Sequence, residues 1–280
     1  MNRKSTIHKI SKDRPGLTTV NGDDQSYFYT SRRLRKDLGP IQGNHYIFLT
    51  YHQMAKALML PKKWNRLEVQ SSMAFLLGSI LFVTGSITQL QNQWIFKTLF
   101  MLGSVLFLTG SLTQLWQTFR AWRRQKKYIL ISLSLALVGV IGAKAGTLFF
   151  NADSISDWLN LNLATRTRKL LGPDAYMAGS FMFLISGIAH YAEIGHGRLV
   201  FVEKNHLGWW VCFSFLVGSA LYCLSALHGY DTAINLPFGL SSEKNSILLC
   251  LIASAIFIFM SLCSLAECSE NETNDLGCNQ

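Results

Sequence analysis

The sequence predicts an all-α, polytopic integral membrane protein with six transmembrane helices. Six windows are long and apolar enough to cross a hydrocarbon core about 30 Å thick, which takes about 17–25 residues. A segment of the first window returns almost unchanged in the second, and the basic residues gather on one side of the windows. The composition agrees, since 49% apolar and 15% charged residues describe several spans joined to a polar extension.

The spans are placed at Met73–Leu90, Trp94–Leu115, Tyr128–Phe150, Ala175–Ala192, Leu207–Leu227 and Ile247–Leu265. Twenty Lys and Arg residues lie before the first span and in the second and fourth connections, against four in the third and fifth connections. Cytoplasmic loops are the ones rich in Lys and Arg. We therefore expect a protein of the cell inner (plasma) membrane with both termini in the cytoplasm, and no nucleic acid as a partner.

Residues 1–43 are polar and basic, and they predict a mobile cytoplasmic arm. The cluster Arg32-Arg33-Leu34-Arg35-Lys36 predicts contact with anionic lipid at the cytoplasmic face, with another polyanion as the less favoured partner. Residues 44–66 follow, where His45–Leu60 carries apolar residues at helical spacing. We expect an amphipathic helix lying on the membrane surface and a basic, aromatic collar that ends at Arg66.

The first two spans form a hairpin of nearly equal halves. LGSILFVTGSITQLQ (Leu77–Gln91) returns 25 residues later as LGSVLFLTGSLTQLW (Leu102–Trp116), with 11 of 15 positions identical. At 100° per residue, the glycines and phenylalanine of each copy share one helix face. Small residues let transmembrane helices approach closely. We therefore expect helix contacts at Gly78, Gly85, Gly103 and Gly110.

The motif G-S-x-x-[FY] occurs in four of the predicted spans. Its small residues are Gly78 and Ser79, Gly103 and Ser104, Gly179 and Ser180, and Gly218 and Ser219. On these residues the chain resembles the YrhK-like domain family, small bacterial membrane hairpins whose two helices each carry Gly-Ser next to Phe. The resemblance covers residues 66–117 and, more loosely, residues 175–227. It implies a membrane hairpin, and it implies no reaction, cofactor or catalytic residue.

Parity predicts how the two Gly-Ser hairpins are oriented. If Tyr128–Phe150 is a single further crossing, the second hairpin starts from the outside, and residues 67–150 and 175–265 form two opposed halves of three spans. If that segment does not cross, the halves are parallel. Residues 151–174 predict a surface helix on the outer face, and residues 266–280 predict an acidic, disordered tail.

Three polar side chains in or beside the spans are candidates for function. Lys144 is the charge deepest in a predicted span, and we expect its stem to reach the outer interface, with an internal pair or a pathway as the alternative. His190 and Glu193 share a helix face where the fourth span ends. They predict a hydrogen-bonded pair at the interface, with a proton relay or a cation site as the alternative.

The motifs of common enzymes do not occur in the sequence. It has no H-E-x-x-H, no P-loop and no G-x-S-x-G, so we expect no catalysis, cofactor or metal. The leading hypothesis is a membrane scaffold or regulatory component that could associate with copies of itself as a homo-oligomer. The alternative is a small-solute or ion transporter or channel with two related halves. Transporters use broken helices at the midplane, and the predicted spans contain no proline, which favours the scaffold.

Overall fold

The fold was obtained as a computed structural model of all 280 residues. It describes residues 7–10, 17–20, 26–28, 31–36, 41–42, 66–89, 91–124, 130–159, 165–195, 197, 202, 206–230 and 242–269. Six of its helices are long and apolar enough to cross a membrane. The chain is therefore a multi-spanning membrane protein, as the hydropathy predicts.

The spanning helices are longer than the windows that predict them. Their bounds are α3 (Leu67–Thr88), α4 (Gln93–Arg124), α5 (Leu130–Trp158), α7 (Pro173–Ile194), α8 (Leu207–Tyr230) and α9 (Ser242–Ser269). At a rise of about 1.5 Å per residue, even 22 residues cover about 33 Å, enough for a hydrocarbon core. Pro173 begins α7, where its missing N–H is no loss and its fixed φ suits the first turn.

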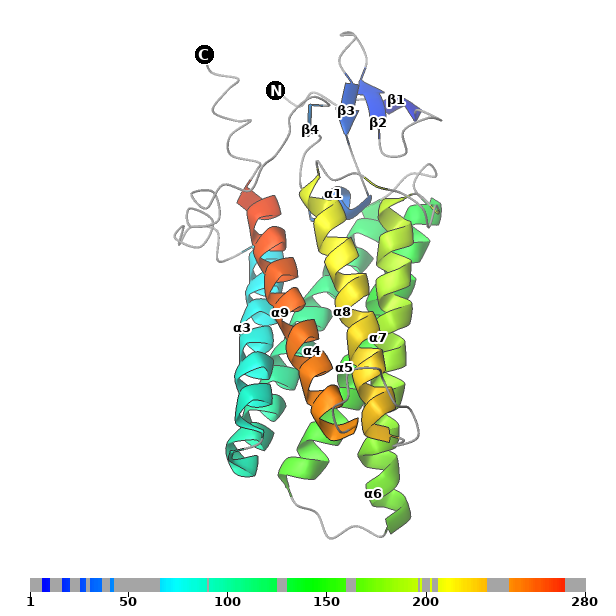
Figure 1. The fold of residues 1–280 in the computed structure, drawn as a ribbon. Helices are drawn as coiled ribbons and strands as arrows, with labels where there is room; N and C mark the ends of the chain where they lie inside the picture. The colour runs from blue at the N-terminus through cyan, green and yellow to red at the C-terminus, as the bar shows by residue number, and fades with distance from the viewer. Residues whose placement is uncertain are drawn as a thin grey trace.

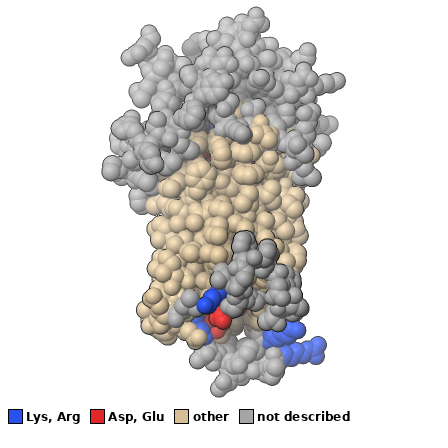
Figure 2. All heavy atoms as spheres, in the orientation of Figure 1, with Lys and Arg blue, Asp and Glu red and all other residues tan. Residues whose placement is uncertain are grey.

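The sides of the bundle are apolar, as contact with lipid requires. Figure 2 shows one face, where a broad band between the two ends displays no Lys, Arg, Asp or Glu among the described residues. Large side chains such as Leu77, Ile80 and Ile87 of α3 point outward and are exposed. In water such a surface would be a liability, and in a bilayer it is the ordinary outer surface of a bundle.

The six spanning helices form a closed ring. Each packs against the next in sequence, and α9 packs against α3. The helices alternate in direction, so that α3, α5 and α8 begin at the end of the bundle where α9 ends (Figure 1). We call this end the terminal face and the other end the far face. Helices α3 and α7 run in opposite directions (Figure 1).

Close contacts divide the ring into three antiparallel pairs. A Cβ added at Gly78 of α3 would lie 2.6 Å from the ring of Phe107 on α4. The same construction at Gly146 of α5 gives 2.5 Å to Phe183 on α7, and at Gly218 of α8 it gives 2.6 Å to Phe257 on α9. These contacts therefore repeat three times along the chain, whereas the sequence led us to expect two halves.

An aromatic layer fills the middle of the ring. Each spanning helix contributes one ring, namely Phe82, Phe107, Phe150, Phe183, Tyr222 and Phe257. Ring centroids are 5.2 Å apart for Phe82 and Phe107 and for Phe150 and Phe183, and 5.5 Å apart for Tyr222 and Phe257. Contacts of 5.9–6.4 Å join the three pairs, distances at which aromatic rings still attract one another.

The N-terminal segment differs from the mobile arm that its polar sequence predicts. Antiparallel strands β1 (Ile7–Ile10), β2 (Leu17–Val20), β3 (Ser26–Phe28) and β4 (Ile41–Gln42) form one sheet in that order. Helix α1 (Ser31–Arg35) lies between β3 and β4 in sequence and packs against α4, α5 and α7. The sheet lies beyond the terminal face in Figure 1.

Two further predictions need correction, and one falls outside the described residues. The predicted surface helix at residues 151–174 is instead the end of α5, which continues to Trp158, and a short helix α6 (Thr165–Leu171). The predicted tail begins too early, because α9 continues to Ser269 and Glu267 is buried. The amphipathic helix predicted for residues 44–66 lies outside the described residues, except for Arg66, which is exposed.

Candidate functional site

Helix α1 buries basic side chains in the terminal face of the bundle. Arg32, Arg33, Arg35 and Lys36 are only 3–7% exposed. A solvated cluster on the membrane surface was expected, so this is a correction. Lys and Arg are almost never fully buried unless they are paired, and the pairs are supplied by the ends of α7 and α9.

Glu267 on the last turn of α9 accepts hydrogen bonds from two of these cations. Arg32 donates from Nε to Glu267 Oε2 at 3.0 Å, and Lys36 donates from Nζ to the same oxygen at 2.7 Å. Both cations also reach the hydroxyl of Ser264, at 3.3 Å and 2.9 Å, and that hydroxyl contacts Ser72 of α3 at 2.9 Å. These bonds connect α1 to two neighbouring spanning helices.

Glu193 at the end of α7 holds the third cation. Arg35 binds its two carboxylate oxygens with Nε at 3.1 Å and Nη2 at 2.7 Å, the bidentate geometry that makes such pairs strong. The Nη1 of Arg35 donates to Thr118 on α4 at 3.1 Å. His190 Nδ1 lies 3.1 Å from Glu193 Oε2, so the two residues paired in the sequence analysis do meet. They lie buried beneath α1 instead of at an open interface.

The buried guanidinium of Arg32 keeps the ionised form that its ion pair requires. Burial lowers the pKa of the Arg32 guanidinium, but the carboxylates of Glu267 and Glu193 more than offset this and raise it above its ordinary value. The pKa of His206, which precedes α8, is shifted in the opposite direction. Burial and the charge of Arg33 lower its pKa to about 4, so this imidazole is neutral at pH 7. We call the buried set of Arg32, Arg35, Lys36, His190, Glu193 and Glu267 the charged layer.

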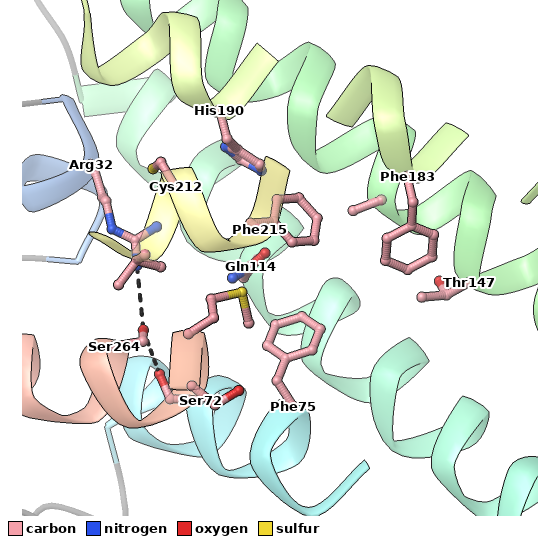
Figure 3. A pocket seen from close by; sticks show the side chains of 14 residues that line it. Arg32, Ser72, Phe75, Gln114, Thr147, Phe183, His190, Cys212, Phe215 and Ser264 are labelled. Carbon is pink, nitrogen blue, oxygen red and sulfur yellow. Dashed lines mark hydrogen bonds between the residues drawn. The ribbon is translucent and has the colours of Figure 1, made fainter. Parts of the chain in front are cut away.

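A small enclosed cavity lies between the charged layer and the aromatic layer. Its volume is about 30 Å³, and Arg32, Gln114, His190 and Phe183 are among the side chains that line it (Figure 3). A water molecule needs about 10–15 Å³ by this kind of measure. The cavity therefore has room for two or three waters hydrogen-bonded to the polar side chains around it.

The glycines and serines of the predicted helix faces are buried. Gly78 and Gly103 lie against each other, since a Cβ added at either would come within 3.0–3.2 Å of the carbonyl oxygen of the other. Gly85 lies against Phe100, Gly110 against Phe75, Gly179 against the backbone of Gly146, and Gly218 against Phe257. The hydroxyl groups of Ser79, Ser104 and Ser180 donate to backbone carbonyls within their own helices. Ser219 is fully buried.

Lys144 takes no part in the charged layer. It is half-buried on α5 and is not among the described residues that line the enclosed cavity. The hydroxyl of Thr147, one turn further along, donates to the backbone carbonyl of Lys144 at 2.8 Å. Its expected reach toward the interface stays a prediction.

Two helices of the repeated pattern, and the partners of the basic cluster, were not predicted from the sequence. In α5 the equivalent of Gly-Ser is Gly146-Thr147 before Phe150, and in α9 it is Ala253-Ser254 before Phe257. Relaxing the motif to [GA]-[ST]-x-x-[FY] would have found both. The pairing of Arg32 with Glu267 spans 235 residues of sequence and has no local signal.

The chain was compared with protein-family models, with curated proteins and with solved structures, and none of them matches it. The resemblance to YrhK-like hairpins therefore stays a prediction.

Proposed function

We propose that this chain is a non-enzymatic membrane protein that docks its own N-terminal segment on the terminal face and serves as a scaffold or regulatory component. We place the terminal face in the cytoplasm, because the basic residues are concentrated there. The observation that carries the proposal is the charged layer, in which α1 is tied to α4, α7 and α9. Because Arg32 binds α9 and Arg35 binds α4 and α7, α1 couples the N-terminal segment to the arrangement of these three helices.

The energetics favour a docked α1. Each buried ion pair has already incurred the cost of removing its charges from water, so that removing one partner leaves a buried charge uncompensated. Such losses amount to about 3–5 kcal/mol. The two carboxylates therefore act as the anchors, and neutralising them should release α1 from the bundle.

Trypsin provides the test, because it cleaves after Arg and Lys, and the three basic residues of α1 and Lys36, which follows it, are buried in the docked state. In detergent-solubilised protein we expect slow cleavage at Arg32, Arg35 and Lys36, and much faster cleavage in a Glu193→Gln, Glu267→Gln double variant. Mass spectrometry of the released N-terminal fragments measures both rates. Exposed Arg66 serves as the internal standard for protease activity.

Asp157→Asn is the matched control for loss of a carboxylate. Asp157 pairs with Lys97 at 2.8 Å, but Asp157 is exposed and the pair lies at the far face, away from α1. Surface pairs contribute about 1 kcal/mol or less. The control should be cleaved like the wild type. A cleavage rate in the double variant equal to that of the wild type would contradict the docking proposal.

Transport of a small solute or ion is the second candidate, because cavities occur on both sides of the aromatic layer. The enclosed cavity of about 30 Å³ lies toward the terminal face, and a wider pocket opens at the far face. The six rings separate them, and Lys144 is not among the described residues that line either one. Solute flux into proteoliposomes that Lys144→Met abolishes would replace the scaffold proposal with this one.

A further inference from the structure

The far face carries a pocket that the docking of α1 does not explain. Its volume is about 390 Å³, within the range of about 300–1,000 Å³ that is usual for small-molecule sites. Five of the six spanning helices contribute to its lining, and Gln89, which follows α3, does so as well, so the pocket lies on the axis of the ring. Cys250 and Tyr176 belong to its lining, and each lies about two turns from the ring that its helix contributes to the aromatic layer.

The described lining is acidic and aromatic. Asp153 of α5 and Glu243 of α9 supply carboxylates, and no Lys or Arg is among the described lining residues. Phe96 and Phe100 of α4 lie with ring centroids 4.5 Å apart, and Tyr176 of α7 lines the pocket as well. A cation placed among such rings is attracted by their faces, in addition to the carboxylates.

Among the described residues, Asp153 has no ion-pair partner of the kind that its neighbour Asp157 has. Asp157, one turn further along α5, forms an ion pair with Lys97 at 2.8 Å. Within the described part of the chain, the carboxylate of Asp153 makes no ion pair and accepts no hydrogen bond, although the residue is half-buried. A half-buried carboxylate without a partner is stabilised by a cation brought in by a ligand.

We propose that this pocket binds a small organic cation, with its ammonium group beside Asp153 and its apolar part against Phe96, Phe100 and Tyr176. A bare metal ion fits less well, because the described residues contain no group of three His, Cys, Asp or Glu side chains placed to hold one. An anion is disfavoured by the two carboxylates. The site goes beyond the scaffold proposal, since it lies at the opposite end of the bundle from the charged layer.

Binding of phenethylamine to the full-length protein in detergent tests this inference. The amine carries an ammonium group on a short aromatic body, and phenethyl alcohol is its uncharged analogue. Isothermal titration calorimetry should show saturable binding of the amine, and binding at least tenfold weaker for the alcohol. Asp153→Asn should weaken amine binding by at least tenfold, since hydrogen bonds to charged groups contribute about 1.5–3 kcal/mol.

The control is again Asp157→Asn, which removes a carboxylate from the same helix outside the described pocket lining and should bind the amine like the wild type. If Asp153→Asn fails to fold, Glu243→Gln tests the second carboxylate at an exposed position and should also weaken binding. Equal binding of amine and alcohol, or equal effects of the Asp153 and Asp157 variants, would mean partitioning into the micelle and would overturn the proposal. Trypsin cleavage of α1 is independent of these results.

Discussion

Replacing Gly146 with alanine tests the three-pair packing of the ring most directly. The new Cβ would lie 2.5 Å from the ring of Phe183 and 2.9 Å from the carbonyl oxygen of Gly179. Carbon atoms in ordinary contact are about 3.5–4.0 Å apart, so either the ring or the helix backbone must move by about 1 Å. The ring of Phe183 also packs against Phe150, with ring centroids 5.2 Å apart. The carbonyl oxygen of Gly179 belongs to helix α7, so it moves only if the helix moves.

The expected loss follows from two opposing effects. Overfilling a packed core costs about 1–3 kcal/mol, whereas alanine in place of glycine within a helix returns up to about 1 kcal/mol. We expect Gly146→Ala to lower the free energy of unfolding by about 1–2 kcal/mol. Gly78→Ala should behave similarly, because it also meets a backbone oxygen, at 3.0 Å. Gly218→Ala should cost less, since the closest atoms it meets belong only to the ring of Phe257.

The assay is unfolding in mixed detergent micelles with increasing dodecyl sulfate, followed by tryptophan fluorescence. Gly229→Ala is the matched control, because its added Cβ would come no closer than 3.4 Å to Ser246 Oγ, an ordinary contact. We expect this variant to be as stable as the wild type or slightly more stable. If Gly146→Ala is as stable as Gly229→Ala, the close α5–α7 contact does not exist as described and the three-pair packing is wrong.

Three further outcomes are expected. Lys144→Met should insert and fold normally, with a free energy of unfolding within about 0.5 kcal/mol of wild type, because a side chain outside the core contributes little. Asn92→Ala should lose about 1 kcal/mol, since the Asn92 side chain caps α4 by accepting from the backbone N–H groups of Trp94 and Ile95 at 3.1 and 3.2 Å; Gln91→Ala is its control. After removal of the native cysteines, a cysteine at Gln91 should react with an impermeant reagent from outside the cell and one at Arg66 should not, and the reverse pattern would overturn the orientation.

The long apolar windows were sufficient to predict the spanning helices. A segment in lipid has to satisfy its backbone hydrogen bonds internally, so about 20 apolar residues already imply a helix. The helix faces follow from the same local information, because a 3.6-residue period places Gly78 and Phe82 on one side whatever the rest of the chain does. The helix directions follow from counting crossings.

The pairing of helices could not be predicted in this way. Gly146 and Gly179 are 33 residues apart, and both Gly179 and Gly218 carry the same motif, so the sequence allowed α7 to be paired with α8 as readily as with α5. In the structure α7 packs against both neighbours: the contact of Gly179 lies toward α5, whereas Gly187 lies against the backbone of Leu216 on α8. Short connections decide which helices are adjacent. The shapes of the side chains across each interface decide which neighbour a given glycine approaches closely.

The basic cluster of residues 32–36 shows most clearly the difference between what the sequence determines and what only the tertiary structure determines. By itself, the sequence established that Arg32, Arg35 and Lys36 are cations near the first span, which is the pattern of a membrane-surface segment. Only the tertiary structure brings them to Glu193 and Glu267, 158 and 231 or more residues away, and buries all of them. Burial of a charge depends on whether a distant partner can replace its water, and that is a property of the assembled bundle.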